Sequence, residues 1–529
     1  MIKVLITDKL ANEGIDLIQA TDSAEAVVKI GISEDELANI IRDYDGLIVR
    51  SETKVTAKVL ANPGRLKVVA RAGVGVDNID VSAATRKGIL VMNTPGGNTL
   101  SAAEHTMALM LAMSRNVVQA CNSLKSGAWD RKRYTGNQLN NKVLGIIGLG
   151  RVGMAVAKMA RGFNMKVLGY DPLAAPTDAG QLGVQVTNDI ARIFRESDII
   201  TVHVPKNPQT LNMIGADQIG MMKPTVRLVN CARGGIINEE ALYDALAKKR
   251  IAGAALDVFS SEPPEDKRFA SLDNCIVTPH LGASTEEAQV EVAVEAAQIL
   301  LDAVRGGPIR NAVNAPSTAG AMPPLVSQYA DLARRIGRLL STIAPGNIKG
   351  VQVQYRGSIA GLSVQAVTLN FAVGLLQKHF DMPLNTVNTP VLARERGISI
   401  DETKNTEAKD VASSFSATVA TSEVTRTVRG SVFGETLLRI MEIDGFHSEM
   451  TPQGTVLVIF NDDKPGVIGR VGTVLGNHGI NIGTMGVGQK LELQKAVLAV
   501  SLDKEPDATT IDELKKLDFV NELYVCTLD

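Results

Sequence analysis

Val143-Leu-Gly-Ile-Ile147 leads directly into Gly148-Leu149-Gly150-Arg151-Val152-Gly153, and the helical pattern Met154–Gly162 follows. A strand, a glycine-rich turn and a helix in this order predict a dinucleotide-binding site. Gly148 permits the tight turn, Gly150 lets a pyrophosphate approach the backbone, and Gly153 lets the helix pack against the strand. N–H groups at the helix N-terminus attract phosphate, so we expect Gly148, Gly150, Arg151, Val152 and Gly153 to bind the cofactor. A cluster of turn glycines without a ligand is the alternative.

An acidic residue follows the next strand of the pattern. The run Met165–Tyr170 ends at Asp171, 18 residues after Gly153. A carboxylate there accepts hydrogen bonds from the ribose hydroxyls of adenosine and repels a 2′-phosphate. Asp171 therefore predicts NAD rather than NADP, although an Asp that only caps its strand would look the same.

Apolar runs of strand length continue on both sides of this motif, with helical patterns between them. Before it lie Val4–Thr7, Gly46–Arg50, Lys67–Arg71 and Ile89–Met92; after it lie Ile199–Val204, Val226–Asn230, Ile251–Val258 and Cys275–Thr278. Expected helices include Ala57–Ala61, Ser101–Ser126 and Glu286–Val304. Such alternation is typical of parallel sheets covered by helices, and it predicts an α/β fold with two doubly wound domains.

The chain changes character after a Pro- and Gly-rich connection that begins at Gly306. Residues 325–452 start as a helix and continue with strand-like runs such as Val424–Phe433 and Thr436–Ile443. The last 75 or so residues have the order strand, helix, strand, strand, helix, strand. These patterns predict two further α+β domains, at 317–452 and 453–529.

Composition excludes several classes of protein. Fifty-five basic residues balance 57 acidic ones and only one Trp is present, which argues against nucleic-acid binding. The four cysteines are too few and too scattered for a disulfide scaffold or a metal site, so no metal is expected. No apolar run reaches 18 residues and the N-terminus reads as a strand, so we expect a soluble, cytoplasmic protein without a membrane partner.

Three polar residues follow strands of the second domain, at the edge where doubly wound sheets bind ligands. They are Arg233, Glu262 and His280. Removing hydride from a secondary alcohol needs a base for the hydroxyl proton, and His280 suits that task with Glu262 orienting it. Arg233 suits a substrate carboxylate. Taken singly, a turn histidine, a solvated glutamate and a surface arginine are the ordinary alternatives. His105, within a helix, and His203, within a strand, are expected to be structural.

Four motifs carry a family resemblance. Arg71-Ala-Gly-Val-Gly-Val-Asp77-Asn-Ile-Asp80, the turn at Gly148–Gly153, Asn230-Cys-Ala-Arg-Gly-Gly235 and Thr278-Pro-His-Leu-Gly-Ala283 resemble the D-2-hydroxyacid dehydrogenases. Over its whole length the chain is similar to the long-form phosphoglycerate dehydrogenase branch of that family. The resemblance implies a flavodoxin-like substrate domain at 1–98, closed by a return segment at 284–316, and a Rossmann NAD domain at 99–283.

The same resemblance implies roles for further residues. Arg233, Glu262 and His280 form the family's catalytic set, with His280 as the acid/base. The NAD site then also includes Val204, Cys231, Ala232, Arg233, Asp257, His280, Gly282 and Ala283. The substrate site includes Arg50, Ser51, Gly73, Val74, Gly75 and Arg131. One departure is Val204-Pro205-Lys206, where family members often carry Thr-Pro-Leu, which removes a hydroxyl from a cofactor-contact loop.

The C-terminal segment resembles an ACT domain, a module that binds amino acids. The resemblance rests on Asn461-Asp-Asp-Lys-Pro-Gly466 and Gly479-Ile-Asn481-Ile. It implies an L-serine effector held by Asn461, Asp463 and Asn481 at a subunit interface, and a homotetramer. A module that serves only to dimerise is the alternative.

Together these patterns and the resemblance imply NAD-dependent oxidation of 3-phospho-D-glycerate to 3-phosphohydroxypyruvate, the first step of L-serine synthesis, under feedback by serine. Two alternatives remain at this point. One is a glyoxylate or hydroxypyruvate reductase with the same catalytic residues. The other is a non-catalytic, NAD-sensing co-repressor on the same fold.

Overall fold

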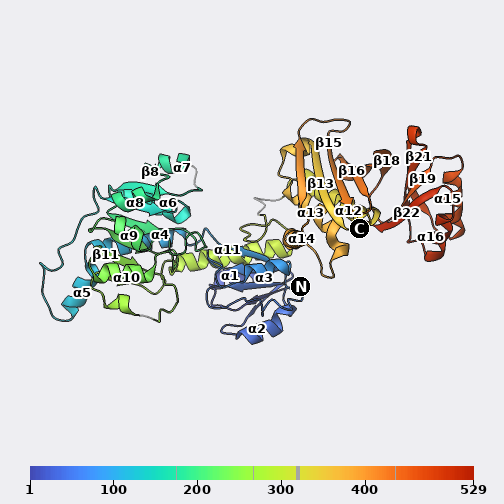
Figure 1. Ribbon diagram of the computed structural model, residues 1–529. Helices are drawn as coiled ribbons and strands as arrows, with labels where there is room; N and C mark the ends of the chain where they lie inside the picture. Colours follow the sequence, from blue (N-terminus) through green and yellow to red (C-terminus); the bar gives the residue numbers. More distant parts are fainter. Residues whose placement is uncertain (174–175, 266, 317–321, 435) are drawn as a thin grey trace.

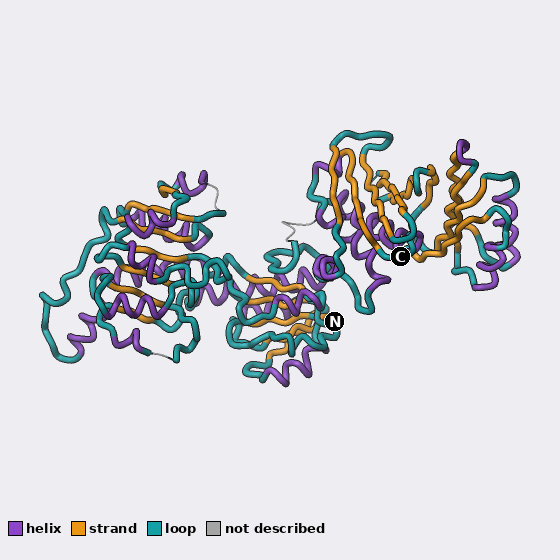
Figure 2. The backbone as a smooth tube through the Cα atoms, viewed as in Figure 1, coloured by secondary structure: helices purple, strands orange, loops and turns teal. Residues whose placement is uncertain are grey.

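Four β-sheets follow one another along an elongated molecule in the computed structural model, which describes residues 1–173, 176–265, 267–316, 322–434 and 436–529 (Figure 1). We number the parts that contain these sheets the first to the fourth unit. The first two units lie on one side of Figure 2 and the last two on the other. Among the described residues, no helix has both the length and the apolarity needed to cross a membrane.

The first unit contains a parallel sheet in the order β2-β1-β3-β4-β5, which is the flavodoxin-like order. Its strands are β1 (Ile2–Ile6), β2 (Ala24–Val28), β3 (Gly46–Val49), β4 (Val68–Arg71) and β5 (Leu90–Asn93). Helices α1 (Asn12–Gln19), α2 (Glu34–Ile40) and α3 (Val81–Arg86) connect them, and α11 (Glu286–Val304) returns to pack on α1 and β4. Alanine and leucine side chains of α11 lie in the core of this unit.

The second unit contains a seven-stranded parallel sheet in the order β12-β11-β10-β9-β6-β7-β8. Its strands are β6 (Val143–Ile147), β7 (Lys166–Tyr170), β8 (Val184–Val186), β9 (Ile199–Val202), β10 (Arg227–Asn230), β11 (Gly253–Leu256) and β12 (Cys275–Val277). Its helices are α4 (Thr99–Ser114), α6 (Arg151–Gly162), α7 (Pro176–Gln181), α8 (Ile190–Glu196), α9 (Ala216–Met221) and α10 (Glu239–Ala247). All strands are parallel, but the strand order reverses between β6 and β9, so the ligand-binding crevice of a Rossmann sheet is expected there. The predicted fold class is confirmed.

Several predicted elements differ from those observed. The expected helix Ser101–Ser126 is two helices, α4 and α5 (Val117–Lys125), because Asn116 between them has a left-handed φ of 50°. Ala57–Ala61 is a turn rather than a helix. Strands β2 and β8 were not expected from the sequence. Both lie at sheet edges, where one side stays exposed and the apolar signal is weak.

The third unit packs long helices on a mixed six-stranded sheet in the order β14-β13-β15-β16-β17-β18. Its helices are α12 (Pro324–Ile343), α13 (Gln365–Leu376) and α14 (Thr389–Glu395). Its strands are β13 (Ile348–Gly357), β14 (Ile400–Asn405), β15 (Ser413–Thr421), β16 (Thr425–Phe433), β17 (Leu437–Ile443) and β18 (Phe446–Met450). Short 3₁₀ turns occur at 41–43, 268–271, 358–361, 377–379 and 491–493.

The fourth unit has the predicted strand-helix-strand-strand-helix-strand order. Its elements are β19 (Thr455–Asp462), α15 (Val467–Asn477), β20 (Ile482–Lys490), β21 (Lys495–Leu502), α16 (Ala508–Lys515) and β22 (Val520–Thr527). One face of its antiparallel sheet contributes Val456, Val458 and Phe460 to the core built around α12. The third and fourth units therefore share one hydrophobic core.

Candidate functional site

The glycine-rich turn has the geometry that its sequence predicts. A Cβ at Gly148 would lie 2.6 Å from the carbonyl oxygen of His203, and one at Gly153 would lie 2.0 Å from that of Gly148. Gly148 also has a φ of 97°, which favours glycine. A Cβ at Gly150 would meet nothing within 4 Å, so open space adjoins the N-terminus of α6. The first helical bond runs from Met154 N to Gly150 O, and the preceding N–H groups face this space free of helical partners.

Asp171 directly follows β7 and contacts this turn. Its Oδ2 accepts a hydrogen bond from the backbone N–H of Leu149 at 2.9 Å, and its Oδ1 accepts one from Leu173 at 2.8 Å. A carboxylate has about four acceptor positions, so further hydroxyl donors can still bind. Val204 lies on the other side of the turn, beside Gly148. The predicted cofactor residues of β6, β7 and β9 therefore converge on one crevice.

Glu262 and His280 form a hydrogen-bonded pair beyond the ends of β11 and β12. His280 Nδ1 lies 2.6 Å from Glu262 Oε2, and the backbone N–H of Phe259 donates to Glu262 Oε1 at 3.0 Å. Burial raises the pKa of Glu262, but the hydrogen bonds from His280 and Phe259 outweigh burial and hold the pKa below its ordinary value. The carboxylate is thus ionised, and the pairing at Nδ1 leaves His280 Nε2 available to a substrate.

An apolar cavity of about 390 Å³ adjoins this pair. Its other walls are Phe259, Pro263, Pro264, Val277, Thr278 and Pro279. The His280 and Glu262 side chains are themselves 45% and 36% exposed, so the pair stays accessible beside these apolar walls.

Asp257 lies beneath the same loop and is fully buried. Its carboxylate accepts hydrogen bonds from the backbone N–H groups of Leu281 and Gly282, at 2.8 and 2.9 Å. It also accepts one from Thr278 Oγ1 at 2.6 Å. Burial raises its pKa, but these bonds together with one from His105 outweigh burial, and the pKa lies below its ordinary value. The buried carboxylate therefore fixes the backbone that follows His280.

Arg233 bridges the first and second units. Its Nε donates to Asp77 Oδ2 of the first unit at 3.0 Å, and its guanidinium lies against Gly75. We call this meeting place of the two units the cleft. A Cβ at Gly75 would come within 1.9 Å of Arg233 Nη2, so a side chain there would displace the guanidinium from its present position. The structure thus brings the predicted loop at 73–75 together with Arg233.

Two more arginines lie beside Arg233. Burial lowers the pKa of Arg71 to about 10, and the positive charge of Arg233 acts in the same direction. Arg71 Nε is buried without a hydrogen-bond partner among the described residues. Arg50 also lies close enough to repel Arg71. Three guanidinium groups with one exposed acidic neighbour, Asp77, form a cluster suited to an anion such as a carboxylate or phosphate.

The loop that carries Arg50 and Ser51 is held by a buried carboxylate. Asp8 accepts hydrogen bonds from the backbone N–H groups of Arg50 and Thr53, at 2.5 and 3.0 Å. Asn78 Nδ2 donates to the carbonyl oxygens of the same two residues. The predicted substrate loop is therefore anchored at Arg50 and Thr53 by hydrogen bonds within the first unit.

Arg131 does not reach this cluster within the chain. It follows α5, which Figure 1 shows at the outer end of the second unit. Its neighbour Arg133 pairs with Asp273, which precedes β12 at the sheet edge opposite His280. A role for Arg131 in substrate binding stays a prediction, and it requires a second copy of the chain.

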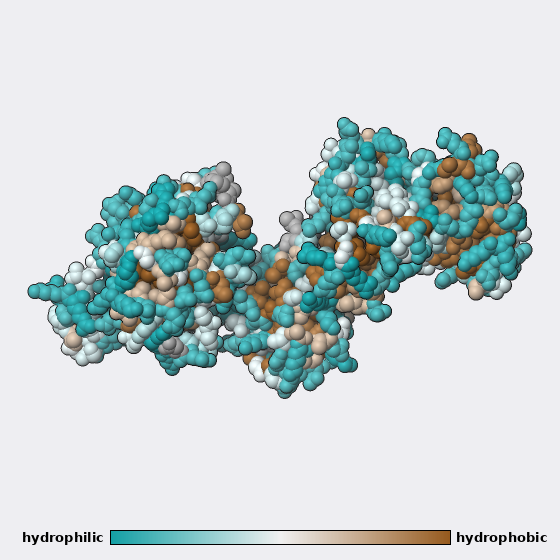
Figure 3. All heavy atoms as spheres, in the orientation of Figure 1, coloured by the Kyte–Doolittle hydropathy of each residue, from teal (hydrophilic) through white to brown (hydrophobic). Residues whose placement is uncertain are grey.

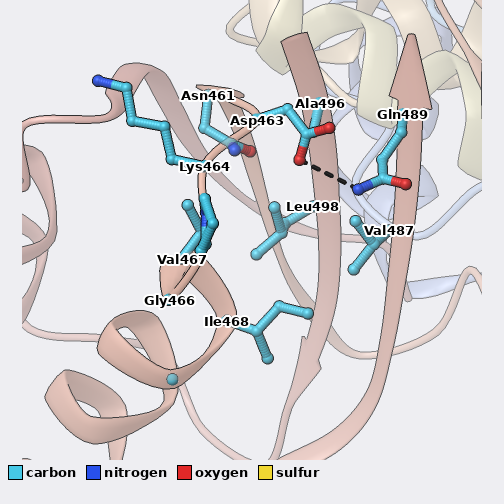
Figure 4. A pocket seen from close by; sticks show the side chains of 12 residues that line it. Asn461, Asp463, Lys464, Gly466, Val467, Ile468, Val487, Gln489, Ala496 and Leu498 are labelled. Carbon is cyan, nitrogen blue, oxygen red and sulfur yellow. Dashed lines mark hydrogen bonds between the residues drawn. The ribbon is translucent and has the colours of Figure 1, made fainter. Parts of the chain in front are cut away.

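The fourth unit has a pocket of about 500 Å³ between α15 and β20, shown in Figure 4. Asn461 and Asp463 line it, opposite Val487 and Gln489. Gln489 Nε2 donates to Asp463 Oδ1 at 3.0 Å. Asn461 is 1% exposed and its Oδ1 has no hydrogen-bond partner within the described residues, so an acceptor is free for a ligand.

Asn481 is separate from this pocket. It precedes β20, whereas Val487 and Gln489 lie towards the other end of that strand. Eight strand residues span about 26 Å. The structure thus brings together two of the three predicted effector residues, and Asn481 of the same chain is not among the lining side chains.

Sequence reasoning missed several residues of the cleft. The motif from Arg71 to Asp80 predicted no role for Arg71, Asp77 or Asn78, and Asp8 lies outside every predicted motif. The available signal was a polar residue at the end of a buried strand, as Arg71 is in β4, or just after one, as Asp8 is after β1. His105 was expected to be structural, and the sequence did not show that its ring would contact Asp257 across 152 residues of sequence. Periodicity within a helix carries no signal for such a contact.

Three family models match successive parts of the chain. Residues 107–282 match the D-isomer specific 2-hydroxyacid dehydrogenase NAD-binding domain. Residues 325–444 match the D-3-phosphoglycerate dehydrogenase intervening domain, and residues 455–519 match the ACT domain.

Full-length relatives are similar over the whole chain. A D-3-phosphoglycerate dehydrogenase of Synechocystis is 40% identical over 529 residues, covering 100% of this chain and 95% of that protein. One of Methanocaldococcus jannaschii is 40% identical and covered completely on both sides. Among solved structures, an Aquifex aeolicus D-lactate dehydrogenase complexed with NAD and lactic acid matches 59% of this chain and all of its own, at 29% identity and a TM-score of 0.53.

Proposed function

The chain belongs to the D-3-phosphoglycerate dehydrogenase family, and from this membership we propose that its cleft oxidises 3-phospho-D-glycerate to 3-phosphohydroxypyruvate with NAD. This is the first step of L-serine synthesis. The observation that carries the proposal is the pairing of His280 with the Glu262 carboxylate, 2.6 Å apart, beside the three-arginine cluster. The His280–Glu262 pair supplies a base, and the arginine cluster supplies anion recognition.

The crevice fits NAD. Open space at Gly150, uncommitted N–H groups at the start of α6 and the Asp171 carboxylate suit a pyrophosphate and an adenosine ribose. Further contacts are assigned to Val204, Cys231, Ala232, Gly282 and Ala283, whereas the fully buried Asp257 holds the Gly282 backbone beneath them. Burial raises the pKa of Cys231 to about 12, so it contributes a neutral thiol. When bound, NAD supplies the hydride acceptor.

The protein residues then perform the remaining chemistry. Arg233 binds the carboxylate of the substrate and polarises its C2 oxygen as that oxygen becomes a carbonyl. As the hydride leaves C2, His280 Nε2 takes the hydroxyl proton. The resulting imidazolium is stabilised by Glu262, which is already hydrogen bonded to Nδ1. One hydride and one proton leave the substrate, so the alcohol becomes a ketone.

The phosphate of the substrate distinguishes this proposal from a glyoxylate or hydroxypyruvate reductase. We assign the phosphate to the Arg50 and Arg71 side of the cleft, with Ser51 and the loop Gly73-Val74-Gly75 lining the substrate site. NADH formation with 3-phosphoglycerate, compared with D-glycerate and glycolate, tests the assignment. Turnover confined to the phosphorylated acid supports it. Faster turnover of an unphosphorylated acid would move the assignment to the reductase, and NAD binding without turnover of any acid would favour the co-repressor.

Replacing Asp171 with Ser is expected to lower the preference for NAD over NADP roughly 10- to 100-fold, because a charge-assisted hydrogen bond and a repulsion of 2′-phosphate are both lost. The ratio of kcat/KM values for the two cofactors measures this preference. Asp171→Asn is the matched control, because it retains an acceptor for the Leu149 N–H but not the charge. An unchanged ratio in the Ser variant would remove Asp171 from this role.

The pocket of the fourth unit is proposed to bind L-serine as a feedback inhibitor. Asp463 offers a carboxylate to the ammonium group, and Asn461 offers its unpaired Oδ1. Asn481 completes the site from a second copy of the chain, because its own chain places it too far away. Ligand binding rather than assembly alone is proposed because three polar side chains, Asn461, Asp463 and Gln489, line one pocket.

Asp463→Ala is expected to weaken inhibition by L-serine by roughly 10-fold or more, since it removes a charged partner of the ammonium group. The serine concentration that halves NADH formation is the measurement. Glu513→Gln, on α16 and outside the pocket lining, serves as the control. Equal sensitivity of wild type and Asp463→Ala would exclude this pocket as the serine site.

We further propose a homotetramer, built from two exposed apolar surfaces. Helix α5 has no buried residue, and Trp129 in the segment after it is 77% exposed. Apolar residues also gather over the fourth unit in Figure 3, where Ile468, Leu491 and Leu493 are more than half exposed. Two different self-complementary contacts generate a tetramer with two-fold symmetry axes. In such an assembly Arg131 can reach the substrate site of a neighbouring copy.

A cytoplasmic location is the last element of the proposal. It is supported by Cys121, Cys231, Cys275 and Cys526, which are all free thiols. Free thiols persist in a reducing compartment.

A further inference from the structure

His105 lies on α4 and reaches the buried carboxylate beneath the catalytic loop. Its Nε2 is 3.2 Å from Asp257 Oδ1 and 3.3 Å from Thr278 Oγ1. The imidazole is 19% exposed and Asp257 is fully buried. Helix α4 begins where the chain crosses from the first unit into the second, so His105 joins that crossing helix to the ends of β11 and β12.

The contact has a defined direction of donation. Asp257 is ionised, because its hydrogen bonds hold its pKa below the ordinary value, and it can only accept. The Thr278 hydroxyl lies 2.6 Å from Asp257 Oδ1 and donates to it. The remaining proton between these groups must come from His105, so Nε2 carries a hydrogen that it donates to Asp257 Oδ1.

Asp257 in turn accepts hydrogen bonds from the backbone of His280 and of the two residues that follow it. The His280 backbone N–H donates to the Asp257 carbonyl oxygen at 2.8 Å. The next two N–H groups, of Leu281 and Gly282, donate to the Asp257 carboxylate. His280 itself has a left-handed φ of 56°, a backbone conformation that is uncommon for residues with a side chain. The orientation of one buried carboxylate thus sets the backbone that aims the imidazole.

We propose that His105 is a positioning residue for catalysis, which acts by holding the Asp257 carboxylate and through it the strained backbone at His280. The inference rests on the proposed function for its kinetic consequence, but its structural consequence stands without turnover. His105 donates one of the four hydrogen bonds that fix the carboxylate. Without that donor the carboxylate turns, the Leu281 and Gly282 bonds weaken, and the His280 ring leaves its pairing geometry with Glu262.

His105→Leu tests this, with His105→Gln as the conservative variant, because a glutamine amide retains an N–H donor. We expect kcat of the Leu variant to be about 10- to 100-fold lower, the loss typical when a catalytic group is misplaced by about 1 Å. The change in KM for 3-phosphoglycerate should be much smaller. We expect a larger deuterium isotope effect on kcat with substrate deuterated at C2, because the chemical step becomes slower. The Gln variant is expected to recover most of kcat.

A second readout is independent of turnover. Amide hydrogen exchange in the peptide that contains Leu281 and Gly282 is expected to be faster in His105→Leu than in wild type or His105→Gln. Thr106→Ser is the matched control, since it removes a buried methyl group from the next position of α4 and keeps the hydroxyl that bonds Ala102. Its exchange and isotope effect are expected to match wild type.

The outcomes separate the two proposals. Wild-type kcat and wild-type exchange in the Leu variant would overturn the positioning role and leave the proposed function intact. Loss of activity in parallel with the melting temperature, with an unchanged isotope effect and no recovery by Gln, would also overturn it. Wild-type protein that does not turn over 3-phosphoglycerate would contradict the proposed function, while accelerated exchange confined to the Leu variant would still support the positioning role.

Discussion

Replacing His280 with Ala is expected to lower kcat by about 10²-fold or more while NAD still binds, because the substitution removes the general base but leaves the glycine-rich turn unchanged. His280 Nδ1 is paired with Glu262 at 2.6 Å, and only the opposite ring nitrogen is available to the hydroxyl proton. In the Ala variant that proton must leave to water, which is less well placed. The loss should therefore appear in kcat more than in KM.

Steady-state kinetics with 3-phosphoglycerate, together with calorimetric titration of NAD, measure both parts of this expectation. The chain offers a matched control in His478→Ala, because His478 Nε2 also pairs with a glutamate, Glu513, at 2.9 Å, but on the fourth unit. That variant should keep the wild-type kcat. Near-normal turnover by His280→Ala would remove His280 from the mechanism.

Arg233→Gln should lower kcat/KM for 3-phosphoglycerate by about 10²- to 10³-fold, the loss typical of removing one preorganised donor to a developing oxyanion. Arg233 follows β10 of the second unit and pairs with Asp77 of the first, so its removal takes away substrate recognition and a link across the cleft. Arg233→Lys should recover part of the loss, since it keeps the charge without the two-pronged donor geometry.

Kinetics of Arg233→Gln with varied substrate separate the effect on KM from that on kcat. Arg192→Gln is the control within the same unit: it breaks an exposed pair with Glu196 along α8, which contributes little. A kcat/KM for Arg233→Gln within threefold of wild type would contradict the assignment of the carboxylate to Arg233.

The fold was largely predictable because its strongest signals are local. Buried parallel strands give continuous apolar runs, so the sequence predicted all the strands of the two parallel sheets except two at their edges. Ala24–Val28 is partly exposed along its whole length, and Val184–Val186 has only three residues. The break between α4 and α5 depends on one backbone angle at Asn116, a residue that tolerates the left-handed region without requiring it.

The candidate site was predictable where residues follow strand ends directly. Arg233, Glu262 and His280 all do, and parallel strands carry such residues to one edge. Contacts between distant segments were not predictable in the same way. Asp8 reaches the loop at Arg50, and His105 reaches Asp257, because tertiary packing brings those segments together. For Arg131 and Asn481 the single chain does not place the side chain at the predicted site, so any role for them requires a second chain.

The most direct test of the mechanism follows the hydrogen at C2 of the substrate. Wild-type protein is incubated with NAD and 3-phosphoglycerate deuterated at C2, and the reduced cofactor is analysed by mass spectrometry. Direct hydride transfer from C2 to NAD predicts one deuterium in each molecule of NADH formed and none in the 3-phosphohydroxypyruvate. Reduced cofactor without deuterium, or no reduced cofactor while NAD binds, would contradict it.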